Sequence, residues 1–210
     1  MNLEQYNIII LDCDGVIFDS NNLKIEAFKN SLNEYNSKIV ENFINYFKEN
    51  FGTSRYNLTR VFIENFLEIK FSQNLYQKIL ENYGVECVKL YTQASFTTKC
   101  IDFIDFYKNK KLYVASGSDE VELNRVFEQR KIRGNFEKVY GSPISKTILV
   151  EKICKENEGK NIVMIGDAKS DYLATKDNNI DFIFMKDYST SQDMKNNNSL
   201  TTIDNLGDLI

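Results

Sequence analysis

Residues 8–20 read IIILDCDGVIFDS, and the fold follows from this stretch. Its first four residues are all apolar, and three of them are isoleucine. An unbroken apolar run of this length is typical of a strand that is buried on both faces, as in the centre of a parallel sheet. The run stops at Asp12, and Gly15 permits a tight turn shortly afterwards. The sequence therefore predicts a central strand that carries Asp12 and Asp14 at its carboxyl end.

Four later segments resemble this first strand, and helical patterns separate them. They are residues 112–115, 138–140, 162–165 and 180–185. Strands that alternate with helices are typical of α/β proteins whose strands are mostly parallel. The sequence therefore predicts the α/β class, with a doubly wound, mostly parallel, Rossmann-like core sheet.

Three polar positions predict where helices of this core begin. Asp119 and Glu122 have the spacing of a capping box. Ser142 precedes Pro143, the single proline, and the pair predicts an N-cap and a first helical position. Ser170 predicts the N-cap of the helix that follows it.

Residues 21–95 break the alternation, because their apolar residues recur at helical spacing. Three such helical faces are present: Ile25, Phe28, Leu32 and Tyr35; Leu58, Val61, Phe62 and Phe66; and Leu75, Tyr76, Ile79, Leu80 and Tyr83. Gly84 predicts the end of the third helix. We expect an insertion of four or five helices, in which the aromatic residues pack against one another rather than stack on a ligand. The chain then divides into a core domain, residues 1–20 and 96–210, and an inserted α-helical cap domain, residues 21–95.

The composition excludes several classes of function. The net charge is -4 and the basic residues are spread among acidic ones, so we expect no nucleic-acid partner. No apolar run could span a membrane and no signal peptide is visible, so we expect no membrane partner. The four cysteines are scattered singly, which is typical of free thiols in a cytoplasmic protein. The absence of histidine excludes catalytic triads that use it and His-ligated zinc.

Polar residues follow several predicted strands at the point where each strand ends. They are Asp12 and Asp14 after the first strand, Ser116, Gly117 and Ser118 after the second, Lys146 after the third, and Asp167 and Asp171 after the fourth. The carboxyl ends of parallel strands meet at one edge of a sheet, so we expect one crevice to collect them. Crowded carboxylates need a cation, and their hard oxygen atoms favour Mg²⁺. With Lys146 and Ser116 as donors, the pattern predicts a phosphate site with one carboxylate free to attack.

The same residues, in the same order, resemble the four motifs of the haloacid dehalogenase superfamily. The motifs are Asp12-x-Asp14-Gly15-Val16, the strand that ends in Ser116, Lys146, and Gly166-Asp167-x-x-x-Asp171. The inserted helices resemble the C1-type cap that this superfamily places after its first strand. The resemblance implies a phosphatase or a mutase rather than a dehalogenase, because the dehalogenases lack the aspartate at the position of Asp14.

The resemblance also implies a role for each motif residue. Asp12 would be the nucleophile, and Asp14 the general acid and base. Ser116, Gly117 and Lys146 would hold the phosphoryl oxygens. The magnesium ligands would be Asp12, the backbone carbonyl of Asp14, and Asp167, with Asp171 as a further ligand or an orienter of Lys146. Ser118 is either a helper of Ser116 or a residue at the start of the next helix.

Residues of the insertion are the candidates for choosing the substrate, because the core recognises only phosphate. Arg55, Tyr56 and Asn57 stand in a polar turn between two helices, and Lys24 stands on the first helix. Asp19 and Ser20 predict the hinge into the insertion, with substrate contact as the alternative. Cys13 is expected to be a packed residue, since its side chain should point away from those of its neighbours.

These observations predict a magnesium-dependent phosphatase for a small polar phosphomonoester, such as a sugar, polyol or amino-alcohol phosphate. A phosphosugar mutase is one alternative, in which Arg55 and Lys24 would bind a second phosphate. A non-catalytic sensor of phosphorylated metabolites is another, although a sensor would need neither Asp12 nor Asp14. The sequence indicates no particular oligomeric state.

Overall fold

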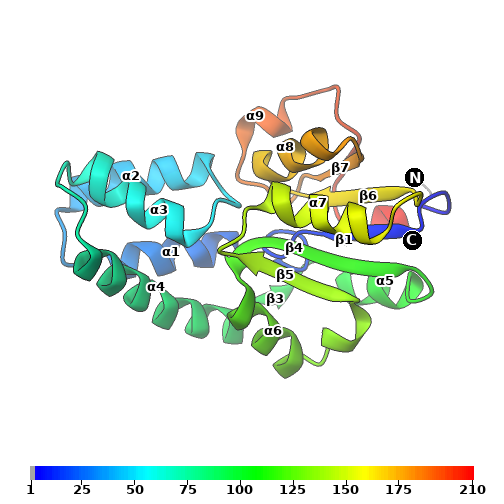
Figure 1. Cartoon of the computed structure of the whole chain (residues 1–210), viewed down its shortest axis with the longest axis horizontal. Coiled ribbons are helices and arrows are strands. Elements are labelled where there is room, and N and C mark those ends of the chain that lie inside the picture. The colour runs from blue at the N-terminus through cyan, green and yellow to red at the C-terminus, as the bar shows by residue number, and fades with distance from the viewer. Residues whose placement is uncertain (1–2) are drawn as a thin grey trace.

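A six-stranded parallel sheet forms the centre of the computed structural model, which describes residues 3–210 (Figure 1). Its strands lie in the order β5-β4-β1-β6-β7-β8. Their bounds are β1 Ile8–Leu11, β4 Lys111–Asp119, β5 Lys138–Ser142, β6 Ile162–Gly166, β7 Asp181–Met185 and β8 Thr202–Ile203. The five predicted strands are therefore present, and the short β8 adds a sixth. Residues 1 and 2 of the predicted core domain lie outside the described part of the chain.

Strand β1 lies inside the sheet and is buried throughout. Ile8 is in register with Lys111 of β4 on one side and with Ile162 of β6 on the other. Ile9 and Leu11 belong to one hydrophobic cluster, and Ile8 and Ile10 to another. The alternation shows that β1 contributes to a core on each face of the sheet, as a doubly wound fold requires.

Helices cover both faces of this sheet. On one face lie α5 (Cys100–Phe106), α6 (Glu120–Gln129) and the 3₁₀ turn η3 (Leu206–Leu209). On the other face lie α7 (Lys146–Glu156) and α8 (Lys169–Asn178). The predicted doubly wound α/β architecture is confirmed. The short elements η2 (Arg133–Asn135) and α9 (Gln192–Lys195) lie in connections between the larger elements.

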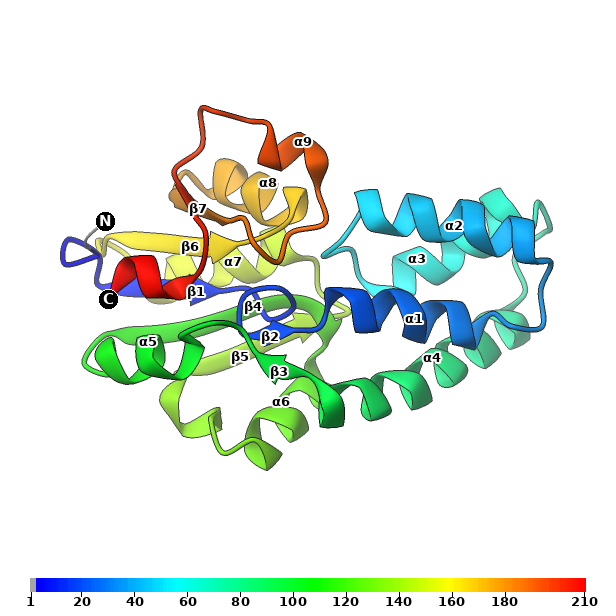
Figure 2. The same ribbon diagram turned by 180° about the vertical axis from the view of Figure 1, so that it is seen from behind.

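A group of helices is inserted between β2 (Phe18–Asp19) and β3 (Ser95–Phe96). They are α1 (Asn21–Ser31), α2 (Ser37–Glu49), α3 (Arg55–Val61), the π turn η1 (Phe62–Phe66) and α4 (Gln73–Gln93), which we call the inserted helices. The strands β2 and β3 pair antiparallel, so the chain leaves the core and returns to it at one place. Figure 2 shows the inserted helices beyond the end of the sheet to which β6 points.

Aromatic side chains form the interior of the inserted helices. The ring of Phe28 stacks on that of Tyr83, with 4.1 Å between the ring centroids, and meets that of Phe43 at 5.1 Å. Phe43 in turn contacts Phe62 at 5.0 Å. Such stacked and edge-to-face pairs stabilise a core beyond the burial of their area. The expectation that these aromatic residues pack against one another is confirmed.

Three predictions from local signals are wrong. Helix α4 does not end at Gly84 but continues to Gln93, because Cys87, Leu90 and Tyr91 extend its buried face. A single glycine inside a helix costs only about 1 kcal/mol, and this packing outweighs it.

Ser142 is no N-cap, because it is the last residue of β5 and pairs with Asp119 of β4. The helix after it begins only at Lys146.

Ser170 is not an N-cap either, since it lies inside the first turn of α8, which follows Ala168. The carboxylate of Asp171 takes over part of the capping and accepts a hydrogen bond from the Ala168 N–H at 2.9 Å. The third predicted start is confirmed, because the Asp119 carboxylate accepts from the Glu122 N–H at 3.0 Å at the start of α6. Within residues 3–210, no helix combines the length and apolarity needed to cross a membrane.

Candidate active site

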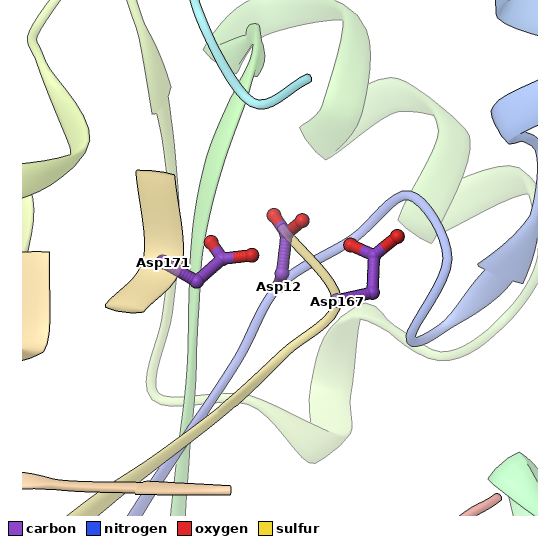
Figure 3. A group of neighbouring side chains, drawn as sticks. All are labelled: Asp12, Asp167 and Asp171. Carbon is purple, nitrogen blue, oxygen red and sulfur yellow. The ribbon is translucent and has the colours of Figure 1, made fainter. Parts of the chain in front are cut away.

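Three aspartates meet at the carboxyl end of the sheet. Asp12 follows β1, Asp167 follows β6, and Asp171 lies in the first turn of α8. In Figure 3, Asp12 stands between the other two, and one oxygen of each carboxylate lies within 4.8 Å of the others. Their exposed fractions are 3%, 3% and 0%. Parallel strands that end side by side thus gather these carboxylates, as their positions in the sequence predict.

The backbone beside this cluster is shaped by Gly15, whose φ is +83°. A Cβ atom at this position would lie 2.3 Å from Oδ2 of Asp167. Glycine is therefore required for two reasons, the left-handed backbone and the absence of a side chain. The turn after Asp12 can approach Asp167 closely only because Gly15 has no Cβ.

Lys146, the first residue of α7, supplies the positive charge of the cluster. Its Nζ lies 2.9 Å from Oδ1 of Asp12 and also bonds to Oδ1 of Asp171. Burial lowers the pKa of Lys146, but the charges of Asp12 and Asp171 outweigh it and raise that pKa well above its usual value. Lys146 is therefore a permanent cation that contacts the predicted nucleophile.

One lysine does not neutralise three buried carboxylates. Burial raises the pKa of Asp12 from 3.8 to about 7, the charge of Asp171 adds to the rise, and Lys146 only reduces it. Burial and the charge of Asp12 also raise the pKa of Asp167. A divalent cation would relieve this repulsion, and a set of carboxylate oxygens is the kind of donor that Mg²⁺ prefers. The residues present fit the predicted metal.

Asp14 has separate surroundings, and its carboxylate is not part of the three-aspartate cluster. Four side chains contact it: Ser20 Oγ at 2.6 Å, Ser118 Oγ at 2.8 Å, Tyr91 O–H at 2.9 Å, and Lys24 Nζ at 2.6 Å. The predicted metal ligand at this position is the backbone carbonyl, and it stays a prediction.

The surroundings of Asp14 favour its charged form. Burial raises its pKa, but the Lys24 ammonium and hydrogen bonds from Lys24, Ser20 and Ser118 outweigh burial, so the pKa is lowered. Burial lowers the pKa of Lys24 while Asp14 raises it more, and the net pKa is raised. The pKa of Asp12 is therefore raised and that of Asp14 is lowered. Opposite shifts of two neighbouring carboxyl groups are typical of groups that have different tasks in one site.

The predicted phosphate-binding residues Ser116 and Gly117 lie near the end of β4. The Ser116 hydroxyl accepts a hydrogen bond from the Ser118 N–H at 3.1 Å. A Cβ atom on Gly117 would lie 2.2 Å from the backbone oxygen of Gly52, so the loop between α2 and α3 rests directly on Gly117. Ser118 contacts Asp14, which gives it a role beyond the start of the following helix.

Arg55, Tyr56 and Asn57 were expected in a turn but form the start of α3, and the first two connect the inserted helices to the core. Arg55 forms two hydrogen bonds with the Glu122 carboxylate, at 2.8 and 2.6 Å, and its guanidinium lies 4.9 Å from the ring centroid of Tyr83. Tyr56 O–H donates to Asp119 at 2.8 Å. Glu122 and Asp119 belong to the start of α6, so α3 is held against the core helix by two side chains.

A cavity of about 20 Å³ remains between the core and the inserted helices. Its lining includes Asp12, Asp14, Asp167, Lys24, Arg55, Phe47, Phe51, Leu58, Tyr83 and the stretch 116–118. This volume holds about one water molecule, which is less space than a phosphate ester needs. Two predicted substrate residues, Tyr56 and Asn57, do not line this cavity in the described chain, and their role stays a prediction.

Sequence reasoning missed two residues that contact aspartates of the predicted site. Tyr91 reaches Asp14 from the end of α4, and Asn21 Nδ2 donates to Asp167 Oδ2 at 2.6 Å. Asn21 also donates to the Tyr188 carbonyl at 2.9 Å. The one available signal was for Tyr91, because helical spacing places it on the buried face that includes Tyr83.

Comparison with known proteins identifies the family. The family model of the haloacid dehalogenase-like hydrolases matches residues 9–185. No curated protein sequence matches this chain. Among solved structures, a haloacid dehalogenase-like hydrolase from Streptococcus pneumoniae has a TM-score of 0.70 and 17% identity, over 96% of this chain and 94% of that one.

Two further structures resemble the fold over nearly the whole chain. A predicted phosphoglycolate phosphatase from Haemophilus somnus has a TM-score of 0.77 and 13% identity, over 98% of this chain and 97% of the other. A predicted phosphatase from Clostridium acetobutylicum has a TM-score of 0.75 and 19% identity, over 98% and 96%. The family model covers residues 9–185, and the aspartates at the strand ends are those of the four motifs. The chain belongs to the haloacid dehalogenase-like hydrolases.

Proposed function

We propose that this hydrolase is a magnesium-dependent phosphatase that acts on a small polar phosphomonoester through an aspartyl-phosphate on Asp12. A sugar, polyol or amino-alcohol phosphate is the substrate class that we expect. The observation that carries the proposal is the position of Asp12 at the end of β1, between Lys146 and Asp167, with the separately held Asp14 two residues later.

In this mechanism an oxygen of Asp12 attacks the phosphorus atom. Ser116, the Gly117 N–H and Lys146 hold the phosphoryl oxygens and stabilise the charge that develops on them. Asp14 in its protonated form gives a proton to the leaving oxygen, which requires that the contacts that lower its pKa are broken first. The resulting carboxylate later takes a proton from the water that hydrolyses the aspartyl-phosphate. Asp12, Asp167, the carbonyl of Asp14 and Asp171 would hold magnesium, which supplies positive charge beside the phosphoryl group.

The predicted metal has a specific task for Asp12. Its pKa of about 7 would leave a large fraction of the carboxyl protonated, and therefore not nucleophilic, at neutral pH. A divalent cation beside Asp12 and Asp167 would favour the ionised form. The proposal therefore explains why three acidic side chains share one buried space.

We further propose that residues 21–95 act as a mobile cap of the C1 type over a core of residues 1–20 and 96–210. The closed cavity supports this, because substrate needs more space than about 20 Å³. The pairing of β2 with β3 supports a hinge at Asp19 and Ser20, since both connections between the two parts cross there. A cytoplasmic location remains a prediction from the sequence.

The experiment is an assay of phosphate release from a panel of sugar, polyol and amino-alcohol phosphates with magnesium. Asp12→Asn serves as the control for the nucleophile and EDTA as the control for the metal. Release that both controls abolish supports the proposal. An inactive but folded protein that binds phosphorylated ligands tightly overturns it. Transfer of phosphate within a sugar, without free phosphate, would instead support the mutase, for which the cavity-lining Lys24 and Arg55 are the candidate second phosphate site.

A further inference from the structure

The Asp14 carboxylate has no acceptor position left for a substrate. Oδ1 accepts from Ser20 and from Tyr91, and Oδ2 is contacted by Ser118 and by Lys24. Tyr91 O–H also lies 3.2 Å from Oδ2. A carboxylate offers about four lone-pair sites, and these donors fill them. The leaving oxygen of a substrate can therefore approach Asp14 only if one of the four donors withdraws.

Lys24 is the donor that is placed to withdraw. Of the four, only Lys24 and Ser118 line the cavity in the described structure. Ser118 belongs to the core strand β4, and its own N–H is bound to the Ser116 hydroxyl. Lys24 reaches the cavity from α1 on a long side chain, so its Nζ can move while the backbone stays in place.

A displaced Lys24 ammonium needs a new partner. The residue is only 8% exposed, and a buried charge without a partner is strongly destabilising. The other carboxylates that line the cavity in the described chain, Asp12 and Asp167, belong to the metal cluster. The second cation of the lining, Arg55, repels an ammonium rather than accepting from it. Lys24 Nζ also donates to the Ser118 hydroxyl, but this neutral group does not balance the ammonium charge. An anionic group of the substrate is the partner that remains.

We propose that Lys24 is a specificity-determining residue that binds an anionic group on the leaving part of the substrate, a carboxylate or a second phosphate. This proposal rests on the proposed phosphatase function, and among small polar phosphomonoesters it selects those whose leaving part is anionic, so that amino-alcohol phosphates no longer belong to the expected class. Phosphorylated hydroxy acids, sugar acids and sugar bisphosphates fit the site. Leaving groups that carry only an amine do not, because Lys24 and Arg55 both face the same cavity.

The test compares substrates that differ only in this group. The first pair is 2-phosphoglycerate and glycerol 2-phosphate, and the second is fructose 1,6-bisphosphate and fructose 1-phosphate. We expect kcat/KM to be at least about 10-fold higher for an anionic member, the range for a hydrogen bond to a charged group. A preference for the anionic member of the first pair would show that Lys24 binds a carboxylate. A preference in the second pair would show that it binds a second phosphate.

Variants then assign the preference to Lys24. Lys24→Met should reduce the ratio of the two kcat/KM values by at least about 10-fold, while Lys24→Arg should retain most of it. The ratio is the readout because a general loss of Asp14 positioning in the variant lowers both kcat/KM values, whereas loss of the contact between Lys24 and the anion lowers only that of the anionic substrate. Lys29→Met, an exposed position on the same helix, is the control that should leave the ratio unchanged.

Two results would overturn the inference while the phosphatase function stands. One is equal or faster hydrolysis of the neutral member in both pairs by the wild-type protein, which needs no variant to fold. The other is an unchanged preference in folded Lys24→Met. Absence of phosphate release from every compound, including p-nitrophenyl phosphate, would instead overturn the phosphatase function and the inference with it.

Discussion

Nζ of Lys24 lies 2.6 Å from Oδ2 of Asp14, so a residue of the first inserted helix contacts the predicted general acid of the core. Tyr91, from the last inserted helix, contacts the same carboxylate. The position of Asp14 therefore depends on both ends of the insertion. Docking of the inserted helices therefore sets which donors this carboxylate contacts.

Removal of the Tyr91 hydroxyl should affect proton transfer more than folding. We expect Tyr91→Phe to lower kcat/KM for alkyl phosphates about 10- to 100-fold, the value of one hydrogen bond to a charged group. The loss should be smaller for p-nitrophenyl phosphate, whose leaving group needs little protonation. Steady-state kinetics on both substrates test this, with Tyr76→Phe on the same helix as the control. Equal losses on both substrates would contradict a role through Asp14.

Asp12→Asn should stabilise the metal-free protein at neutral pH. The folded pKa of Asp12 is raised from 3.8 to about 7, so its contribution to stability is present below pH 4 and is lost as the pH rises toward 7. Burial of the charged form in the acidic cluster is the cause. We expect a gain of about 2 to 4 kcal/mol at pH 7.5 in EDTA, and little gain at pH 4.

Thermal unfolding from pH 4 to pH 8, with EDTA or with MgCl₂, measures this effect. Magnesium should stabilise the wild-type protein more at pH 7.5 than at pH 5, and Asp12→Asn should lose much of that stabilisation. Asp105→Asn, an exposed position on α5, is the matched control. A wild-type protein whose metal-free stability rises steadily from pH 4 to pH 7 would contradict the prediction.

The close approach of Gly117 and Gly52 makes a simple steric test. Gly117→Ala places a methyl group 2.2 Å from the Gly52 oxygen, so the loop between α2 and α3 must move away. We expect activity to fall at least about 10-fold, with a loss of about 1 to 3 kcal/mol in the free energy of unfolding. Activity assays and chemical denaturation measure both.

Gly134→Ala is the control for this steric test, because a Cβ atom there meets no atom within 4 Å. It should leave both activity and stability close to those of the wild-type protein. A fully active Gly117→Ala would show that the loop does not need its contact with Gly117 for catalysis.

The Arg55–Glu122 pair should control how often the inserted helices open. Glu122→Gln removes one charge of a pair at 2.6 Å whose side chains are 7% and 22% exposed. We expect the coupling energy of the two side chains to be about 1 to 2 kcal/mol, because the pair is bidentate but partly hydrated. A double-mutant cycle with Arg55→Met measures this energy.

Opening itself is followed by hydrogen exchange in residues 50–56, which should become faster in Glu122→Gln. Glu128→Gln, farther along α6, is the control, since Glu128 is exposed. Unchanged exchange in Glu122→Gln would mean that other contacts hold the closed state.

The sequence predicted those parts of the site that depend on short apolar runs. Asp12 and Asp167 each follow a strand that its own composition marks, and parallel pairing then brings the strand ends together. Ser116 was expected to follow its strand but lies within β4, which continues to Asp119. The contacts of Asn21 and Tyr91 could not be predicted in this way. Their separations from the residues they contact are 146 and 77 positions, and only the docking of helices on the core sets them.

Single residues that favour a helix end were a less reliable signal than apolar runs. Each of three residues has a general preference for a helix end that the tertiary structure overrides. Packing of α4 overrides it at Gly84, and pairing of β5 overrides it at Ser142. At Ser170, capping by Asp171 takes its place. Lys24 and Arg55 were predicted as substrate residues from their place in the insertion. Their partners in the core, Asp14 and Glu122, are tertiary contacts that no periodicity indicates.

The pairing of β2 with β3 has a consequence for how such a protein can diversify. Phe18 stands opposite Phe96, so the two ends of the insertion are neighbours, and a replacement of the segment between them would leave the strand order of the sheet unchanged. The insertion carries Lys24 and Tyr91, which both contact the predicted general acid Asp14. A chimaera that received the insertion of a relative would therefore differ from this protein in turnover as well as in selectivity.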